Sequence, residues 1–236
     1  MVSDKILIVD NEQEIVQLLA MHLKREGFDV VSTTDSQKAL GIIHREQPDM
    51  ILLDIVMPGM NGIDLCARIR DEYDMPILFL SCKNEVSDKV LGLSIGGDDY
   101  ITKPFSMAEV IARIKTNLKR VRTRSSADTD DIAHSVMEVG GIRADMSAHT
   151  VTAFGSPLSL TSKEFDLLVL LMGSPNRVFT SRQIFERLWD TYGYENDYRT
   201  VMVHISNLRK KIGASISDGS QGPIQNVRSV GYKFVP

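Results

Sequence analysis

Short hydrophobic runs alternate with amphipathic stretches along the first 120 residues of the chain. Five of these runs are almost continuously apolar, which is typical of parallel strands covered on both faces of a sheet. They lie at 5–9, 29–33, 50–54, 76–80 and 100–102. The amphipathic stretches between them predict helices, so we expect an α/β domain with a doubly wound (βα)5 architecture.

Two of the predicted helices show a stripe of apolar residues at helical spacing, and we expect both stripes to lie in the core. The first comprises Ile15, Leu18, Leu19 and Leu23, and the second Val110, Ile111, Ile114 and Leu118. Ser106 and Glu109 have the spacing of a capping box, which predicts the start of the last helix just after Pro104.

The chain after residue 136 has a different order of elements. Four short strands are predicted at 136–139, 142–145, 150–153 and 157–160, followed by helices at 162–173, 181–190 and about 197–212, the last ending at Gly213. Capping boxes at Thr161 with Glu164 and at Thr180 with Gln183 predict the first two helix starts. Two final strands, 224–229 and 232–235, are predicted to form a hairpin.

The third of these helices has two distinct faces. Its predicted buried stripe consists of Val201, Ile205, Leu208 and Ile212, whereas the residues expected to face outward are Arg199, Met202, Ser206, Asn207 and Lys210. The outward face is small, polar and basic. Between the two halves, residues 121–135 lose hydrophobic periodicity and collect Ser, Thr and Asp, so we expect domains at 1–120 and 136–236 joined by a flexible linker.

Length and composition support two globular domains. The chain has 236 residues, of which 43% are hydrophobic and 25% charged, and this excludes the disordered and collagen-like classes. Cys66 and Cys82 are the only cysteines, so a disulfide framework or a structural zinc site is not expected. The chain start does not resemble a signal peptide and no run is long enough to cross a membrane, so we expect a cytoplasmic protein without membrane insertion.

Charge is divided unevenly between the halves. Acidic side chains outnumber basic ones before residue 120, and basic ones are in excess after residue 136, while the whole chain carries a formal net charge of −4. A mild basic excess is common on ordinary solvated surfaces, so the position of the charges has to decide whether nucleic acid is a partner.

Polar residues follow the predicted parallel strands at their carboxyl ends, where α/β sheets bind ligands. These residues are Asp10, Asn11, Asp54, Ser81 and Lys103. Oxygen ligands suit Mg²⁺, a lysine can neutralise a phosphoryl oxygen, and an aspartate can act as a nucleophile toward phosphorus. Each residue alone has an ordinary explanation as a turn former, a helix cap or a solvated charge, but their joint placement favours a phosphoryl-transfer site.

Four strings carry a resemblance to a known family. They read ILIVDNE, MILLDIVMPGMNG, ILFLS and GGDDYITKPF, and over residues 4–120 they resemble the receiver domain of bacterial response regulators. The resemblance implies that Asp54 is the phospho-acceptor, that Ser81 and Lys103 contact the phosphoryl group and that Tyr100 is the switch aromatic. It also implies a Mg²⁺ site made by Asp10, Asn11, Asp54 and the carbonyl of Val56, and a cis bond between Lys103 and Pro104.

Asn11 departs from the family pattern, which has a second acidic residue at this position. An amide oxygen still coordinates Mg²⁺ but brings no negative charge, so we expect weaker Mg²⁺ binding and slower phosphorylation, and a partly active unphosphorylated state is an open alternative. Cys82 also departs, from a small residue beside the site. A packing function is favoured over a redox one for this thiol.

Charged residues between the fourth and fifth helices match the dimer face of the OmpR/PhoB subfamily. By that resemblance the pairs across a symmetric dimer are Lys89 with Glu109, Asp99 with Arg113 and Asp98 with Arg120. The alternative is that they are solvated charges, since exposed ion pairs contribute only about 0 to 1 kcal/mol each. Glu109 cannot serve both its capping box and Lys89, and the intermolecular pair is favoured.

The second half resembles the OmpR/PhoB effector domain, a winged helix-turn-helix. The resemblance rests on LTSKEFDLLVLLM, VFTSRQIFERLW, YRTVMVHISNLRKKIG and IQNVRSVGYKF. It implies that the third helix enters the major groove and the hairpin the minor groove of DNA. Phosphate contacts are then expected from Arg199, Thr200, His204, Arg209 and Lys210, base contacts from Ser206 and Asn207, and a minor-groove contact from Arg228. His204 has an equal alternative, which is to pack beside Trp189.

The two resemblances together imply a two-component response regulator that is a transcription factor and not an enzyme. Its expected partners are a sensor histidine kinase, promoter DNA with directly repeated half-sites, RNA polymerase and a second copy of the chain. One alternative is a transcription factor of the same fold that does not need phosphorylation, because of Asn11. A phosphotransfer enzyme for small molecules is disfavoured, since the sequence has no Gly-rich phosphate loop. The kinase, stimulus, operator, target genes and direction of regulation are not encoded in any recognisable motif.

Overall fold

The computed structural model describes residues 3–81, 92–125, 136–189, 198–216 and 222–236. The chain divides into two compact units, Met1–Leu118 and Lys119–Pro236. Among the described residues, no helix is long and apolar enough to cross a membrane.

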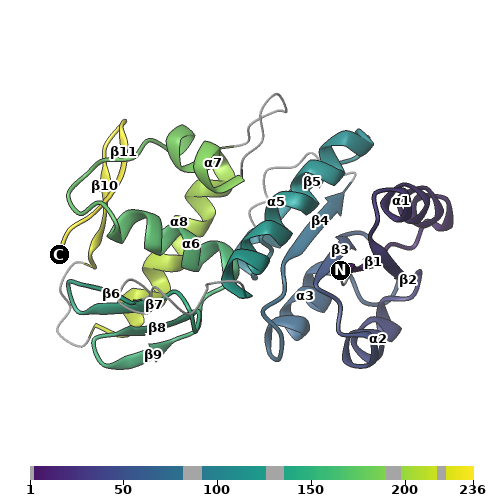
Figure 1. Ribbon diagram of the computed structural model, residues 1–236, viewed down its shortest axis with the longest axis horizontal. Helices are drawn as coiled ribbons and strands as arrows, with labels where there is room; N and C mark the ends of the chain where they lie inside the picture. The colour runs from purple at the N-terminus through teal and green to yellow at the C-terminus, as the bar shows by residue number, and fades with distance from the viewer. Residues whose placement is uncertain (1–2, 82–91, 126–135, 190–197, 217–221) are drawn as a thin grey trace. The chain divides into compact units, whose positions relative to one another are not determined.

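The first unit is a parallel sheet of five strands in the order β2-β1-β3-β4-β5 (Figure 1). The strands are β1 (Lys5–Val9), β2 (Asp29–Thr33), β3 (Met50–Asp54), β4 (Ile77–Ser81) and β5 (Asp99–Thr102). The described helices are α1 (Gln13–Arg25), α2 (Ala39–Glu46), α3 (Gly62–Arg70) and α5 (Met107–Ser125), with a short 3₁₀ turn at Ser36–Lys38. The α/β prediction for this half is confirmed.

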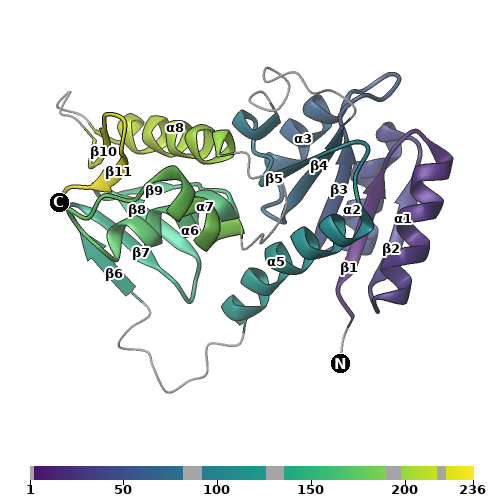
Figure 2. The ribbon, with the colours of Figure 1, turned by 90° about the horizontal axis from the view of Figure 1, so that it is seen from above.

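Alternation of side chains along the strands explains why both faces of the sheet are covered. Ile6 and Ile8 of β1 pack on one face, in a core shared with α1 and α5. Leu7 and Val9 point to the opposite face and pack in a core shared with α2 and α3. Figure 2 shows these helices beside the sheet. After Lys5 at its start, β1 contains only apolar residues, so the first carboxylate that follows it, Asp10, stands at the carboxyl edge of the sheet.

Two details of the helices differ from the sequence prediction. Leu18 was expected in the core of α1 but is 41% exposed, because Val16, Leu19 and Leu23 at i, i+3 and i+7 form the buried row. Helix α5 continues to Ser125, so the first five residues of the expected linker are helical. The other residues of the expected linker, 126–135, lie outside the described residues.

A close approach between α3 and the end of β3 shapes the carboxyl edge of the sheet. The N–H of Gly62 donates to the carbonyl of Ile55 at 2.9 Å. A Cβ on Gly62 would lie 2.0 Å from the backbone oxygen of Asp54, so only glycine fits there. The Lys103–Pro104 bond, just after β5, is cis, as the resemblance to receiver domains implies.

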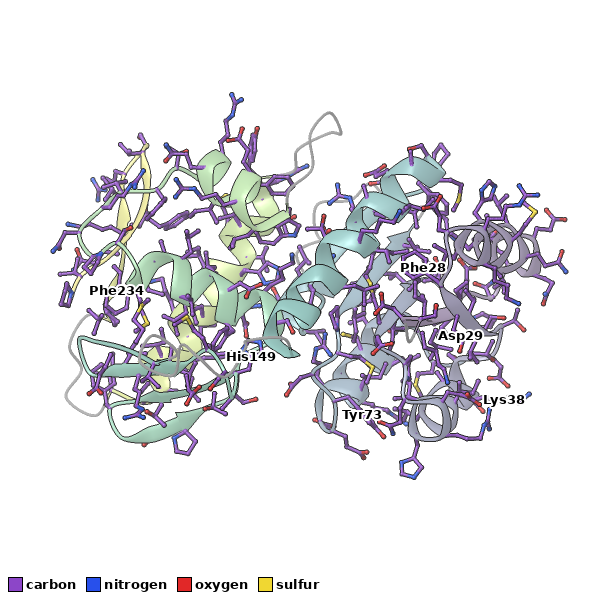
Figure 3. The ribbon with its side chains drawn as sticks, viewed as in Figure 1. Phe28, Asp29, Lys38, Tyr73, His149 and Phe234 are labelled. Carbon is purple, nitrogen blue, oxygen red and sulfur yellow. The ribbon has the colours of Figure 1, made fainter. Side chains whose placement is uncertain are left out.

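The second unit contains an antiparallel sheet, three helices and a hairpin. The sheet consists of β6 (Val136–Val139), β7 (Ile142–Asp145), β8 (Thr150–Ala153) and β9 (Ser156–Leu158), in that order. The helices are α6 (Ser162–Met172), α7 (Ser181–Trp189) and α8 (Arg199–Ala214), and the hairpin is β10 (Ile224–Val227) with β11 (Gly231–Phe234). Phe234, labelled in Figure 3, is fully buried and belongs to the core that the helices share with the sheet.

Capping and a backbone bridge hold these elements in place. Both bonds of the predicted capping box form at Thr161 and Glu164, and both also form at Thr180 and Gln183. Before α7, Phe179 exchanges two backbone hydrogen bonds with Tyr232 of the hairpin, at 2.8 and 2.9 Å. Gly213 does not end α8 as predicted, since the helix continues through it to Ala214.

Candidate functional site

Asp10 and Asp54 stand at the carboxyl ends of β1 and β3, which are neighbours in the sheet. Both are buried, with 0% and 3% of their surface exposed. The strands end at the same edge because they are parallel, so their first polar residues are brought together. The sequence prediction that these two carboxylates share a site is consistent with this placement.

Lys103 reaches the same point from the end of β5. Its Nζ lies 2.8 Å from Asp10 Oδ2, 3.2 Å from Asp54 Oδ1 and 2.9 Å from Glu12 Oε1. The Lys103 side chain is only 7% exposed. A buried ammonium needs compensating charge, and three carboxylates supply it here.

The same contacts determine the protonation properties of the site. The pKa of Asp54 is raised to about 6, because burial and the charge of Asp10 raise it more than Lys103 and the N–H of Val56 lower it. Burial alone would lower the pKa of Lys103, but its bonds to Asp10 and Glu12 and the charge of Asp54 raise that pKa above its usual value. Lys103 is therefore a permanent cation beside a carboxylate that titrates close to neutral pH.

The other predicted residues of this site are placed less completely. Asn11 follows β1 and is exposed, and Val56 is half-exposed in the turn after β3. Tyr100 of β5 is 7% exposed and packs in the core between the sheet and α3. The backbone of Ser81 ends β4, but its side chain and the whole of Cys82 lie outside the described residues.

The exposed side of α8 is basic, as predicted from its sequence. Arg199, Met202, Ser206, Arg209 and Lys210 are all exposed. A pocket of about 300 Å³ lies beside this face, between α8 and the start of β10, with Arg209 and Lys210 in its lining. Arg228 is exposed in the turn between β10 and β11.

Three predicted DNA contacts are buried instead. Thr200, His204 and Asn207 are 6%, 1% and 8% exposed. They lie at i, i+4 and i+7 and so form a second buried row beside the stripe that begins at Val201. The prediction that Asn207 faces outward is therefore wrong. His204 packs beside Trp189, with ring centroids 5.5 Å apart, which is the alternative anticipated for this residue.

Comparisons with known proteins agree with this architecture. Residues 6–115 match the response regulator receiver domain, and residues 155–234 match the C-terminal domain of transcriptional regulatory proteins. The sensory transduction protein RegX3 of Mycolicibacterium smegmatis is 38% identical over 231 residues, which is 97% of this chain and 98% of the relative.

Solved structures give the same result. The C128D mutant of RitR is 26% identical and superposes with a TM-score of 0.75 over 98% of this chain and 99% of that one. DrrB of Thermotoga maritima, described as an OmpR/PhoB homologue, is 24% identical with a TM-score of 0.50 over the whole of both chains, and supports the fold.

The chain belongs to the OmpR/PhoB family of response regulators. This family consists of two-component transcription regulators and not of enzymes. Membership implies a sensor kinase as the partner of the receiver domain and promoter DNA as the partner of the C-terminal domain. The sequence-based identification and the two-part fold, a receiver followed by a winged helix-turn-helix, are confirmed.

OmpR/PhoB receiver domains generally bind Mg²⁺ at their acidic residues. The donors here are hard oxygens of Asp10, Asn11 and Asp54, and these are suitable for that ion. In the described part of the chain, no three His, Cys, Asp or Glu side chains surround a free cation position. The ammonium of Lys103 is instead the cation that Asp10 and Asp54 share. Asp10, Asn11 and Asp54 therefore have the donor chemistry of a Mg²⁺ site.

The charged residues of the family's dimer face that the structure describes, Asp98, Asp99, Glu109 and Arg113, are paired within this chain. Arg113 Nη1 lies 3.0 Å from Asp99 Oδ1, and Arg113 Nη2 lies 3.2 Å from Glu109 Oε1. Ser106 accepts the N–H of Glu109 as the capping pattern predicts, but the Glu109 carboxylate turns to Arg113. Lys89 and the side chain of Arg120 lie outside the described residues.

Two functional candidates were missed by sequence reasoning. Glu12, which the sequence analysis did not single out, contacts Lys103 Nζ at 2.9 Å. Arg70, at the end of α3, bonds Asp98 at 2.7 Å and the carbonyls of Gly96, Tyr73 and Met75. Tyr73 is labelled in Figure 3. No local pattern marks Arg70, because its partners lie on other elements.

Proposed function

We propose that a sensor histidine kinase phosphorylates Asp54 and that this modification controls DNA binding by the second domain. The observation that carries the proposal is the burial of Asp54 with Asp10 and within 3.2 Å of the Lys103 ammonium. This arrangement offers a carboxylate nucleophile and a fixed positive charge at one point. Phosphoryl transfer depends mainly on such positioning and charge stabilisation.

In the proposed transfer step, the residues of this chain that take part are Asp54, Lys103 and Ser81. A carboxylate oxygen of Asp54 forms the new P–O bond while the P–N bond of the donor phosphohistidine breaks, and its electron pair stays with the imidazole, which takes up a proton. Lys103 moves from Asp54 to an oxygen of the phosphoryl group. The hydroxyl of Ser81 then donates a hydrogen bond to another phosphoryl oxygen.

Asp10, Asn11, Asp54 and the carbonyl of Val56 would hold Mg²⁺ in this site. The bound ion supplies further neutralisation of negative charge on the phosphoryl oxygens. Asn11 brings no charge, so the affinity for Mg²⁺ is expected to be lower than with an aspartate at this position.

Phosphorylation is proposed to act through Ser81 and Tyr100 on the face made by β5 and α5. A two-fold dimer would then form with Lys89 and Glu109, Asp99 and Arg113, and Asp98 and Arg120 paired across it. The bonds from Arg113 to Asp99 and from Arg70 to Asp98 within one chain would have to exchange for these intermolecular pairs. Dimerisation places two effector domains on directly repeated half-sites about 10 to 10.5 bp apart.

DNA binding is proposed to use the exposed side of α8 and the hairpin turn. Arg199, Arg209 and Lys210 are positioned to contact phosphates, Ser206 to reach a base edge, and Arg228 to enter the minor groove. The bound regulator would then act on RNA polymerase at the promoter. We propose a cytoplasmic location for the protein, because its proposed site of action is promoter DNA with RNA polymerase.

A second candidate function is regulation of transcription without phosphorylation. It is favoured by one observation, the uncharged Asn11 at the position of an acidic metal ligand. In that case the receiver would keep a single conformation and DNA affinity would not depend on Asp54.

Intact mass after incubation with Mg²⁺ and phosphoramidate tests the proposal. The unmodified chain should gain one phosphoryl group, Asp54→Ala should gain none, and Asn11→Asp should be labelled faster. A lack of labelling in the unmodified chain, even with its sensor kinase, together with DNA affinity unchanged by Asp54→Ala, would establish the second candidate.

A further inference from the structure

Glu12 has an unusual position for a residue that begins a helix. It is the residue before α1, but its carboxylate makes no capping hydrogen bond to that helix. Residues that cap helices in this way are mostly Ser, Thr, Asp and Asn, and a glutamate has no advantage there. The carboxylate extends instead to Lys103 Nζ, 2.9 Å away.

The backbone of Glu12 is held to the same site. Its N–H donates to Asp10 Oδ1 at 2.9 Å. Lys103 is thus surrounded by two buried carboxylates, Asp10 and Asp54, and by a third that is 53% exposed. Among these three oxygens, only that of Glu12 belongs to a residue outside the proposed Mg²⁺ ligands.

The charges of this cluster show what Glu12 contributes. Lys103 Nζ contacts Asp10 Oδ2 and Asp54 Oδ1, so a Mg²⁺ ion that takes these oxygens displaces the ammonium from them, and an ammonium left without an anion inside the protein is costly. Glu12 offers an alternative partner that Lys103 already contacts. It also adds one negative charge next to Asn11, the position at which the site lacks one.

We propose that Glu12 is a positioning residue for Mg²⁺ binding: it retains the Lys103 ammonium when the metal takes Asp10 and Asp54, and it replaces the charge that Asn11 does not supply. This inference rests on the proposed function of the site. Lys103 remains at the rim, held by Glu12, and is available to the incoming phosphoryl group.

Titration of the full-length chain with Mg²⁺ in a calorimeter gives the Kd for the metal. It tests the inference without any measurement of phosphorylation. Glu12→Gln removes the charge and keeps the size of the side chain. It should raise the Kd for Mg²⁺ on the order of fivefold, a moderate effect because Glu12 is half-exposed and its charge is screened. Glu14→Gln is the matched control, since Glu14 is an exposed acid in the first turn of α1, and its Kd should stay within twofold.

The decisive comparison repeats the Glu12→Gln substitution in a chain that already carries Asn11→Asp. With Asn11→Asp in place, the missing charge is restored, so the effect of Glu12→Gln on the Kd should fall to about twofold, which is the part that comes from retaining Lys103. The inference is overturned if Glu12→Gln leaves the Kd unchanged or lowers it, or if the effect is equally large in both backgrounds. The spectrum of Mn²⁺ by electron paramagnetic resonance gives an independent measure of the same affinities.

One further variant separates this inference from the proposed function. Asp54→Asn should weaken Mg²⁺ binding whatever Glu12 does. If Asp54→Asn weakens binding and Glu12→Gln does not, the inference on Glu12 fails while the phosphorylation site stands. If Asp54→Asn also has no effect, the proposed function itself is contradicted.

Discussion

Arg70 and Asp98 form an ion pair of 2.7 Å that is almost completely removed from solvent, with 10% and 1% of the two side chains exposed. The same Asp98 oxygen accepts the N–H of Ile77 at 2.9 Å. Arg70 also donates to three backbone carbonyls, so most of its donors are satisfied. The pair connects the end of α3 to β4 and β5.

Removal of Arg70 should therefore destabilise the receiver domain strongly. Arg70→Ala leaves the charge of Asp98 buried and three carbonyls without their donor, and we expect a loss of about 3 kcal/mol in the free energy of unfolding. Arg68→Ala is the control, because Arg68 lies on the same helix and is exposed. Urea unfolding followed by circular dichroism measures both. A loss below about 1 kcal/mol for Arg70→Ala would contradict the structural importance of the pair.

The raised pKa of Asp54 predicts how stability changes with pH. The carboxyl of Asp54 has a pKa of about 6 in the folded state and 3.8 in the unfolded state. Between these pH values, the folded state therefore binds more protons than the unfolded state. The contribution of Asp54 to the free energy of unfolding is thus fully present below pH 3.8 and is lost as the pH rises through 6. Between about pH 4.5 and 7.5, the unmodified chain should lose about 2 kcal/mol relative to Asp54→Asn, which cannot titrate.

Chemical unfolding of both chains in metal-free buffer at several pH values measures this difference. Trp189, the single tryptophan, lies in the second domain, so its fluorescence serves as an internal reference for unfolding of that domain. Circular dichroism reports the unfolding of both domains. The transition that it shows and that Trp189 fluorescence does not show is therefore the unfolding of the receiver domain. Equal pH dependence of the two chains would mean that Asp54 does not have a raised pKa.

The strands and the candidate site were largely predictable because both depend on local sequence. The apolar runs at 5–9 and 50–54 are typical of short strands buried on both faces, and the polar residues at their ends then bring Asp10 and Asp54 together. What could not be predicted depends on contacts between distant elements. Arg70 and Asp98 are 28 residues apart, and nothing around either residue indicates the other.

The faces of α8 show a second limit of sequence reasoning. The stripe from Val201 to Ile212 was predicted correctly, because apolar spacing reveals it. Asn207 is polar, so periodicity assigned it to the surface, although the buried sector of the helix is wider than the apolar stripe. Polar residues at the edge of a stripe can be assigned only when the elements packed beside them are known.

Two glycines in the receiver domain should respond in opposite directions to alanine. A Cβ on Gly62 would lie 2.0 Å from the Asp54 backbone oxygen, so Gly62→Ala must displace the end of β3 or the start of α3. We expect a loss of more than about 2 kcal/mol. Gly41 lies inside α2 with nothing within 4 Å of a Cβ, so Gly41→Ala should stabilise the domain by about 0.5 to 1 kcal/mol. Urea midpoints test both, and a tolerated Gly62→Ala would exclude the close approach of α3 to β3.

The exposed and buried rows of α8 predict different effects on DNA binding. Affinity for DNA falls with salt, and every phosphate that a protein neutralises adds about 0.9 to the slope of log affinity against log salt. Arg209→Gln and Lys210→Gln should each reduce the slope by about that amount on a duplex of about 30 bp, since both residues are exposed on the proposed DNA face. His204→Phe should leave the slope unchanged, because His204 is 1% exposed and its ring packs beside Trp189.

Fluorescence anisotropy at several salt concentrations gives these slopes. Arg143→Gln is the control, since Arg143 is exposed on β7 and so removes a charge of the same domain away from α8. An equal slope change for Arg143→Gln would show that DNA responds to the total charge of the domain and not to the α8 face. A reduced slope for His204→Phe would mean that His204 leaves its buried position when DNA binds, and α8 would then have to change its packing in the complex.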